Sequence, residues 1–269
     1  MNALLFPGQG SQVVGMGLEF YNNFSIVKKI FEEADEKLNF KISKIILEGP
    51  ENDLKLTKNT QPSILIVSYA IFSVLKKEFN FNFDKTKYFA GHSLGEYSAL
   101  VCSKSLKFDD ALFLLFERGK SMQEAVPVGK GSMIAILGSK IDQIQQFISE
   151  SKLKGICEIA NDNSEGQTIV SGDVESINTL QAFLKNNKKK FISLNVSAPF
   201  HCSLMSPAKE KMKDKINSVN FNKPIFDIVS NVTSKPENNP VKIKKLLIEQ
   251  ICSTVRWRES LINMAEQKV

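Results

Sequence analysis

The amino-acid sequence predicts an α/β protein with a parallel sheet and a smaller βαββαβ module inserted into it. Two observations support this fold class. Short apolar segments at residues 3–6 and 88–91 each lead through a glycine-containing turn into a helical pattern, as strands of a parallel sheet do. Residues 131–196 instead combine short apolar strands with amphipathic helices in the order strand, helix, strand, strand, helix, strand.

The first part of the chain begins with the strand at 3–6, followed by a Pro-Gly-Gln-Gly-Ser-Gln turn and a helix from about residue 17. A second helix is expected at 62–79, because Pro62 suits a first helical turn. The strand at 88–91 then leads into a helix at 96–103. The last helix of this part, at 109–126, has Asp109 near its N-cap.

The middle of the chain changes character. Its expected elements are a strand at 131–138, a helix at 141–152, a strand at 156–160, a polar turn at 161–166, a strand at 167–171, a helix at 174–185 and a strand at 190–196. This order is typical of a ferredoxin-like module. We therefore expect an α/β domain made of residues 1–126 and 198–269, interrupted by a ferredoxin-like subdomain at 127–197.

Composition limits the class of protein further. The chain has 269 residues, of which 42% are hydrophobic and 24% charged, as in a globular protein. No apolar run reaches the ~18–20 residues of a membrane span. The four cysteines form no C-x-x-C pair, which predicts reduced thiols in a cytoplasmic protein and no metal site. The net charge of +6 favours a lysine-rich surface over nucleic-acid binding, and it leaves room for an acidic partner.

The residues Gly91-His92-Ser93-Leu94-Gly95 fit the G-x-S-x-G pattern of a nucleophile elbow. Two glycines allow a sharp strand-to-helix turn that exposes the serine hydroxyl at a helix N-terminus. The pattern falls between a predicted strand and a predicted helix, so we expect Ser93 to be a nucleophile. A plain Gly-Ser turn is the alternative.

A serine nucleophile needs a base, and the chain has only two histidines, His92 and His201. His92 adjoins Ser93, and neighbouring extended residues point to opposite faces. We therefore expect His201 to be the base. Its alternative role is that of an ordinary loop histidine.

Arginine is rare in this sequence, with three among 35 basic residues. Arg118 lies on a mainly apolar predicted helix, and its planar fork could bind a carboxylate through two hydrogen bonds. The alternative is a surface ion pair with Glu117 or Glu124. Arg256 and Arg258, which flank Trp257, are expected at the surface.

Six segments together resemble the family of malonyl-CoA:acyl carrier protein transacylases of bacterial type II fatty-acid synthesis. They are residues 6–12, 59–62, 91–96, 118–123, 161–167 and 197–201. The resemblance implies an α/β-hydrolase-like core with an inserted ferredoxin-like subdomain. It also implies transfer of a malonyl group from malonyl-CoA to the phosphopantetheine thiol of acyl carrier protein through a malonyl-serine.

The resemblance assigns roles to individual residues. Ser93 would attack the thioester, His201 would act as base and then acid, and the main-chain carbonyl of Gln250 would orient the histidine. The remaining assignments concern the substrate: backbone N–H groups of Gln9 and Leu94 as oxyanion donors, Arg118 for the malonyl carboxylate, Asn161 and Asn163 in a polar loop near the site, and Phe200 as a bulky residue that crowds methylmalonyl groups.

The resemblance implies no resident cofactor, and we expect a cytoplasmic monomer whose partners are malonyl-CoA and acyl carrier protein. Chains of this family continue for several tens of residues beyond the position of Val269, with a strand, a Gly-Pro-Gly turn and a final helix. We therefore expect the present sequence to be a truncated form with an unpaired sheet edge.

Two other functions fit parts of the sequence. A thioesterase or lipase would share the elbow and would usually place a carboxylate between serine and histidine in chain order. Acidic residues occur in that interval, so chain order does not exclude this class, and the inserted βαββαβ module and the Gln-rich N-terminal turn argue against it. A scaffold that binds a carrier protein without catalysis is the second alternative. A hydrolase delivers the acyl group to water, and a scaffold would fail to react with a serine-directed fluorophosphonate.

Overall fold

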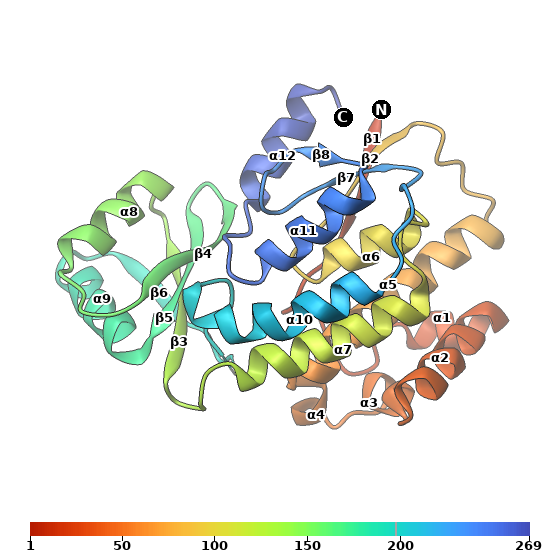
Figure 1. Ribbon diagram of the computed structural model, residues 1–269, viewed down its shortest axis with the longest axis horizontal. Coiled ribbons are helices and arrows are strands. Elements are labelled where there is room, and N and C mark those ends of the chain that lie inside the picture. The colour runs from red at the N-terminus through yellow and green to blue at the C-terminus, as the bar shows by residue number, and fades with distance from the viewer. Residues whose placement is uncertain (197) are drawn as a thin grey trace.

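The computed structural model describes residues 1–196 and 198–269. In these residues the strands form two four-stranded sheets, here called sheet A and sheet B (Figure 1). Sheet A has the order β1-β2-β7-β8 and sheet B the order β4-β5-β3-β6. The protein is therefore a mixed α/β structure, as the sequence predicts.

Sheet A is parallel at its centre. Its strands are β1 (Asn2–Phe6), β2 (Thr86–Gly91), β7 (Asp227–Val229) and β8 (Pro236–Glu237). β2 pairs in parallel with both β1 and β7, whereas β8 runs antiparallel to β7. Consecutive residues at the end of β2 are buried, because helices cover both faces of a parallel sheet.

Helices surround sheet A (Figure 1). They are α1 (Leu18–Asn23), α2 (Ser25–Leu38), α3 (Ile42–Leu47), α4 (Glu51–Lys55), α5 (Thr57–Lys77), α6 (Gly95–Cys102), α7 (Phe108–Glu124), α10 (Ser206–Ser218), α11 (Pro240–Gln250), α12 (Trp257–Glu266) and the short 3₁₀ helix η1 (Ser203–Met205). Every residue of α6 is buried, so this helix lies inside the core and holds the end of β2 in place.

The start of α5 differs from the prediction. The helix begins at Thr57, and Pro62 lies inside it rather than in its first turn. Side chains of the first turn bond to the preceding segment: Asn59 Nδ2 donates to Asp53 O at 2.9 Å and Thr60 Oγ1 to Leu54 O at 2.6 Å. These hydrogen bonds to the preceding segment hold a turn that helix propensity alone does not predict.

Sheet B is antiparallel throughout. Its elements follow the predicted order: β3 (Gly131–Leu137), α8 (Ile141–Glu150), β4 (Cys157–Ser164), β5 (Gln167–Asp173), α9 (Val174–Asn186) and β6 (Lys190–Ser193). Along β3, Met133 and Ala135 join the main core while Ile134 and Ile136 join a separate core under α8 and α9. This two-residue alternation places one face of sheet B against the larger part of the protein.

The predicted polar turn at 161–166 is wrong, because β4 continues to Ser164. The polar end of this strand is held by the chain before α12. Val255 N donates to Ala160 O at 2.8 Å, and Asp162 N donates to Val255 O at 3.0 Å. A polar sequence can therefore remain extended, since its backbone has partners outside sheet B.

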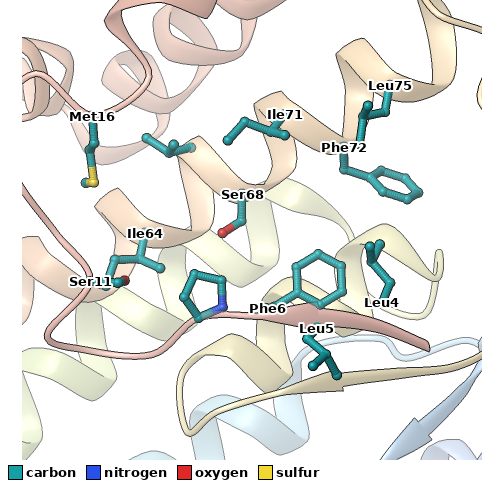
Figure 2. A pocket seen from close by; sticks show the side chains of 12 residues that line it. Leu4, Leu5, Phe6, Ser11, Met16, Ile64, Ser68, Ile71, Phe72 and Leu75 are labelled. Atoms are coloured by element: carbon teal, nitrogen blue, oxygen red, sulfur yellow. The ribbon is translucent and has the colours of Figure 1, made fainter. Parts of the chain in front are cut away.

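An apolar cavity of about 270 Å³ lies between β1 and α5 (Figure 2). Leu4 and Phe6 of the strand face Ile64, Ile71 and Phe72 of the helix across it. No titratable side chain lines this cavity, so it offers no acid or base for catalysis. None of the helices within residues 1–196 and 198–269 has the length and apolar character needed to cross a bilayer.

Candidate active site

Ser93 occupies a sharp turn between β2 and α6. Its φ of 53° lies in the left-handed region, which is rare for a residue with a side chain. The flanking glycines are needed because the backbone approaches itself closely: a Cβ on Gly91 would lie 1.9 Å from Gly95 C, and one on Gly95 would lie 2.6 Å from Phe6 O. This is the strand-to-helix elbow that the G-x-S-x-G pattern predicts.

His201 lies beside Ser93 although 108 residues separate them. Its Nε2 is 2.8 Å from Ser93 Oγ, and its Nδ1 is 2.9 Å from the main-chain oxygen of Gln250. A carbonyl oxygen only accepts, so Nδ1 carries the proton and Nε2 is left to accept the serine proton. The geometry provides a nucleophile, a base and a group that orients the base.

The surroundings of His201 favour its neutral form. Burial, and then the positive charge of Arg118, lower the pKa of His201 to about 3, against the opposing hydrogen bond to Gln250 O. A lowered pKa keeps Nε2 free of a proton at neutral pH. The imidazole is therefore ready to accept a proton before any substrate binds.

This pKa leads to a prediction for the pH dependence of serine reactivity. A neutral fluorophosphonate should label Ser93 at a nearly constant rate from about pH 8 down to about pH 5, because His201 stays unprotonated over that range. The measurement is the labelling rate by intact mass across the pH series. A rate that falls with a midpoint near 6.5, the ordinary histidine value, would contradict it.

Arg118 is buried and only 1% exposed. Its Nη1 donates to Gln61 Oε1 at 2.8 Å, and its Nη2 donates to Gln250 Oε1 at 2.9 Å and to Ser93 Oγ at 3.2 Å. The guanidinium carbon lies 5.9 Å from the ring centre of Tyr97. Arg118 Nε is buried without a hydrogen-bond partner among the described residues, so one edge of the fork remains available to an acceptor.

The surface alternative for Arg118 does not fit this placement. Glu117 pairs with Lys215 at 2.9 Å, and Glu124 pairs with Lys211 at 3.1 Å. The acidic neighbours of Arg118 on its own helix are thus engaged by lysines of α10. Arg118 instead points into the interior, toward the serine.

Gln250 contributes more than its main-chain oxygen. Its Nε2 donates to Ser93 O at 3.1 Å and to Glu96 Oε2 at 2.9 Å. Asn231 completes the support: its Oδ1 accepts from Ser93 N at 2.7 Å and its Nδ2 donates to Gly91 O at 2.7 Å. The elbow is therefore held on both sides by buried amides.

Glu96 is a buried carboxylate directly behind the elbow. Burial raises its pKa to about 7, whereas hydrogen bonds from Asn231 and Gln250 and the charge of Arg118 act in the opposite direction. Because the folded-state pKa lies above the ordinary value, deprotonation of Glu96 weakens folding as the pH rises toward and through 7. The chain retains a buried carboxyl group with a raised pKa at the centre of its site, which is a common property of functional sites.

The two expected oxyanion donors lie at the mouth of the elbow. Leu94 is the N-cap residue of α6, where a backbone N–H is directed out of the helix. Gln9 lies in the turn after β1 and lines the same cavity as Ser93, with its side-chain Nε2 3.5 Å from Thr57 Oγ1. The structure therefore brings both segments to the serine.

A cavity of about 180 Å³ opens onto Ser93. The predicted site residues among its lining are Gln9, Ser93, Arg118, Asn161, Asn163, Phe200 and His201. Leu94, which directly follows Ser93, and Gln250 are not among the lining residues. Gln250 reaches the site through its bonds to Ser93 O, Arg118 and His201. The residues singled out in the sequence thus converge on one small chamber between the two sheets.

One wall of the chamber is the polar end of β4. Asn163 Oδ1 lies 2.8 Å from His92 Nε2, and the His92 ring lies 5.5 Å from that of Trp257 in an edge-on arrangement. His92 therefore takes part in the wall of the site and does not contact the serine hydroxyl as a base. Burial lowers the pKa of His92, which favours its neutral form here.

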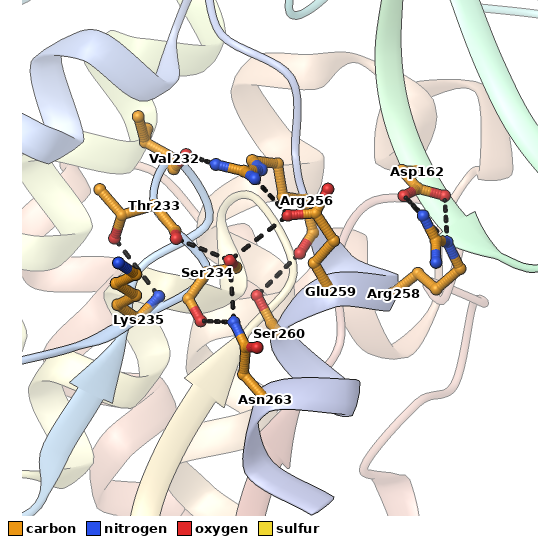
Figure 3. Close-up of polar contacts among 10 residues, drawn as sticks. All are labelled: Asp162, Val232, Thr233, Ser234, Lys235, Arg256, Arg258, Glu259, Ser260 and Asn263. Atoms are coloured by element: carbon orange, nitrogen blue, oxygen red, sulfur yellow. Dashed lines mark hydrogen bonds and ion pairs between the residues drawn. The ribbon is translucent and has the colours of Figure 1, made fainter. Parts of the chain in front are cut away.

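Arg258 holds this wall against the rest of the protein (Figure 3). Its Nε lies 3.0 Å from each carboxylate oxygen of Asp162, and its Nη2 lies 2.8 Å from Oδ2. Asp162 is 1% exposed and sits between Asn161 and Asn163. The side chain of Arg258 is 27% exposed and so lies near the surface as predicted, and its fork also engages a buried carboxylate.

Sequence reasoning missed three polar residues of the site: Gln61, Glu96 and Asn231. Gln61 and Glu96 lie within segments that resemble the family, which is a signal that could have found them. Asn231 follows β7, far from any motif, and only the paired strands bring it to the elbow. Across the described ranges 1–196 and 198–269, no group of three or more histidine, cysteine, aspartate or glutamate side chains is placed to hold a metal ion.

A serine hydroxyl paired with a buried histidine at the carboxyl end of a parallel strand defines an enzyme that transfers acyl groups through a serine ester. Residues 3–269 match the family described as the acyl transferase domain. The chain belongs to that family and, within it, to the malonyl CoA-acyl carrier protein transacylases.

Known proteins are similar to this one in sequence and structure over nearly the whole chain. A malonyl CoA-acyl carrier protein transacylase of Bacillus subtilis (strain 168) is 41% identical over 269 residues, covering 99% of this chain and 84% of the relative. The crystal structure of acyl-carrier-protein-S-malonyltransferase from Bartonella henselae has a TM-score of 0.96 at 40% identity, covering 100% of this chain and 86% of its own. A structure of a type II PKS acyl-carrier protein in complex with its malonyl-transacylase has a TM-score of 0.95 at 37% identity, with 99% and 86% covered.

Proposed function

We propose that this protein transfers a malonyl group from malonyl-CoA to the phosphopantetheine thiol of acyl carrier protein. The observation that carries the proposal is the convergence of two groups on Ser93 Oγ, with His201 Nε2 at 2.8 Å and Arg118 Nη2 at 3.2 Å. One group activates a nucleophile, and the other can hold a carboxylate beside it. The names of the relatives support both the donor and the acceptor.

The reaction proceeds in two symmetrical halves. Ser93 Oγ attacks the thioester carbonyl while its proton moves to His201 Nε2, and the oxyanion is stabilised by the backbone N–H groups of Gln9 and Leu94. The carbon–sulfur bond breaks, and the coenzyme thiolate takes the proton from His201. The thiol of the carrier then attacks the malonyl-serine, its proton passes through His201 to Ser93, and the malonyl thioester leaves.

Arg118 supplies selectivity for a free carboxylate. Within residues 1–196 and 198–269 its Nε has no hydrogen-bond partner, and its Nη2 faces the serine, so the Nε–Nη2 edge can receive the malonyl carboxylate through two parallel hydrogen bonds. The carboxylate would also offset the charge that lowers the pKa of His201. Binding of the correct substrate therefore makes the base stronger where it is needed.

The remaining site residues shape the chamber. We assign Asn161 and Asn163 to its polar wall, where amides can contact the acyl or pantetheine part of the substrate. Phe200 is buried next to His201 and lines the chamber, so it crowds an α-methyl group. One methyl group is worth about 1–3 kcal/mol in a pocket, which corresponds to partial discrimination against methylmalonyl-CoA.

The finer architecture follows the same proposal. We assign residues 1–126 and 198–269 to an α/β-hydrolase-like core and residues 127–197 to a ferredoxin-like subdomain, with residue 197 lying outside the described residues. The order β4-β5-β3-β6 with antiparallel pairing supports the second assignment. The core differs from an ordinary hydrolase in one respect, because a main-chain oxygen orients His201 where hydrolases use a carboxylate.

We further propose that the protein acts as a cytoplasmic monomer without a resident cofactor or metal. Its four cysteines are all free, and burial raises the pKa of Cys102, Cys157 and Cys202. Inert thiols of this kind suit a reducing compartment. The partner that we propose in this setting is the carrier protein.

The test is to mix the protein with malonyl-CoA and holo-acyl carrier protein and to measure malonyl-carrier by mass. Transfer to the thiol should exceed hydrolysis by water, because a transferase protects its ester from water. Release of free malonate without malonyl-carrier would instead identify a hydrolase. Absence of any covalent species would favour a scaffold.

The same assay yields a prediction for docking. Acyl carrier proteins are acidic, and this chain carries a net charge of +6, so transfer to the carrier should weaken with added salt. Transfer to a small pantetheine thiol is the matched control and should change less. Equal salt dependence for the two acceptors would rule out an electrostatically assisted docking face.

A further inference from the structure

Glu96 has no role in the reaction described above, although it is buried at the centre of the site. It lies on α6, three residues after the nucleophile, and is 2% exposed. Its Oε2 accepts hydrogen bonds from Gln250 Nε2 at 2.9 Å and from Asn231 N at 3.1 Å. A fixed carboxylate in such a place requires an explanation, since burying it is costly.

The explanation lies in the two unlike ends of the Gln250 amide. Its Nε2 faces three acceptors: Glu96 Oε2, Ser93 O at 3.1 Å and Asn231 Oδ1 at 3.3 Å. Its Oε1 accepts from Arg118 Nη2 at 2.9 Å. An amide has a donor end and an acceptor end, so the surrounding acceptors determine which end faces Arg118.

A reversed Gln250 amide would place an NH₂ group against the guanidinium of Arg118. Two donors would then face each other in a buried site, and Arg118 would keep Gln61 Oε1 and the Ser93 hydroxyl as acceptors. Nη2 would lose the shorter of its two hydrogen bonds, the one that holds it beside Ser93 independently of the reacting hydroxyl. The orientation of this one amide therefore decides how well Arg118 is aligned.

We propose that Glu96 is a positioning residue that fixes the Gln250 amide and, through it, the carboxylate-binding fork of Arg118. The inference rests on the proposed function, since it concerns selectivity for malonyl over acetyl groups. Glu96 is not among the described residues that line the chamber at Ser93. It acts through Gln250, whose main-chain oxygen also orients His201.

The test compares two substitutions of Glu96, one that removes the charge of its side chain and one that shortens the side chain. Glu96→Gln removes the charge but keeps an oxygen at the same distance, so Gln250 retains an acceptor. Glu96→Asp keeps the charge but withdraws the oxygen by about one carbon–carbon bond, ~1.5 Å. Ser98→Ala is the matched control, because Ser98 is a fully buried residue of the same helix whose hydroxyl has no partner among the described residues.

The readout is the ratio of kcat/KM for malonyl-CoA to that for acetyl-CoA, with the unfolding temperature of each variant measured alongside. We expect the ratio to stay within about threefold of wild type in Glu96→Gln and Ser98→Ala. In Glu96→Asp it should fall roughly tenfold or more, since a misplacement of ~1 Å can cost up to a hundredfold in rate. If Glu96→Asp is unfolded at the assay temperature, Glu96→Ala provides the same loss of the acceptor.

Three results would overturn the proposal: an unchanged ratio in Glu96→Asp, an equal fall in Glu96→Gln, or an equal fall in Ser98→Ala. An equal fall in Glu96→Gln would assign the effect to charge, and an equal fall in Ser98→Ala would assign it to packing. A wild-type protein that transfers no malonyl group would refute the proposed function instead, so the two failures are distinguishable.

Discussion

Ser93→Ala is expected to abolish formation of a covalent malonyl adduct when the protein is incubated with malonyl-CoA. The wild-type chain should gain the mass of one malonyl group, because the serine oxygen is the only nucleophile within hydrogen-bond distance of His201 Nε2 in the described residues. His201→Ala should slow adduct formation by at least ~10²-fold, the usual contribution of a general base. Intact-mass spectrometry over a time course measures both effects.

Ser98→Ala is the control for this experiment, since it removes another buried serine hydroxyl from the helix that follows the elbow. It should acylate as the wild type does. An adduct that persists in Ser93→Ala would place the nucleophile elsewhere, and peptide mapping would then locate it. An unchanged rate in His201→Ala would remove the histidine from the reaction, whatever its distance from the serine.

Local sequence patterns predicted much of the fold because most elements here are short and strongly patterned. The segment at 131–137 alternates between two cores, as its sequence of small and branched apolar residues suggests. The exceptions have a common cause. The first turn of α5 and the end of β4 are polar, and each is held by hydrogen bonds outside its own element. Those of α5 go to residues 53 and 54, and those of β4 go to Val255.

The site residues also divide into those that local sequence could predict and those that depend on distant segments. Ser93 could be predicted because its turn depends on Gly91 and Gly95, which lie two residues before and after it. His201 could be predicted as the base because the only other histidine in the sequence, His92, adjoins the serine. Asn231 could not be predicted, since its contact with Ser93 N spans 138 residues and depends on the parallel pairing of β2 with β7. The sequence also does not reveal which end of the Gln250 amide faces Arg118, because that depends on three acceptors from two segments that lie far from each other in the chain.

Substitution of Arg118 should change which acyl group the enzyme accepts. Arg118→Ala is expected to lower kcat/KM for malonyl-CoA by roughly 10²–10³-fold, because the substrate carboxylate would be buried without its partner. Acetyl-CoA leaves the guanidinium unmatched in the wild type, so its rate relative to malonyl-CoA should rise in the variant. Arg118→Lys should restore only part of the malonyl rate, because an ammonium group cannot make the two-pronged contact.

The measurement is kcat/KM for malonyl-, methylmalonyl- and acetyl-CoA on the wild type and each variant. Arg256→Ala is the matched control: Arg256 lies outside the chamber, where it pairs with Glu259 (Figure 3), so its loss should leave the malonyl-to-acetyl ratio unchanged. Loss of Arg118 should also raise the pKa of His201, because the charge of Arg118 adds to the effect of burial in lowering it. The rate of fluorophosphonate labelling should then begin to fall at a higher pH in the variant than in the wild type. An unchanged malonyl-to-acetyl ratio in Arg118→Ala would remove this arginine from substrate recognition, even if the fall in labelling rate moved as expected, because the two effects depend on different contacts of the same guanidinium.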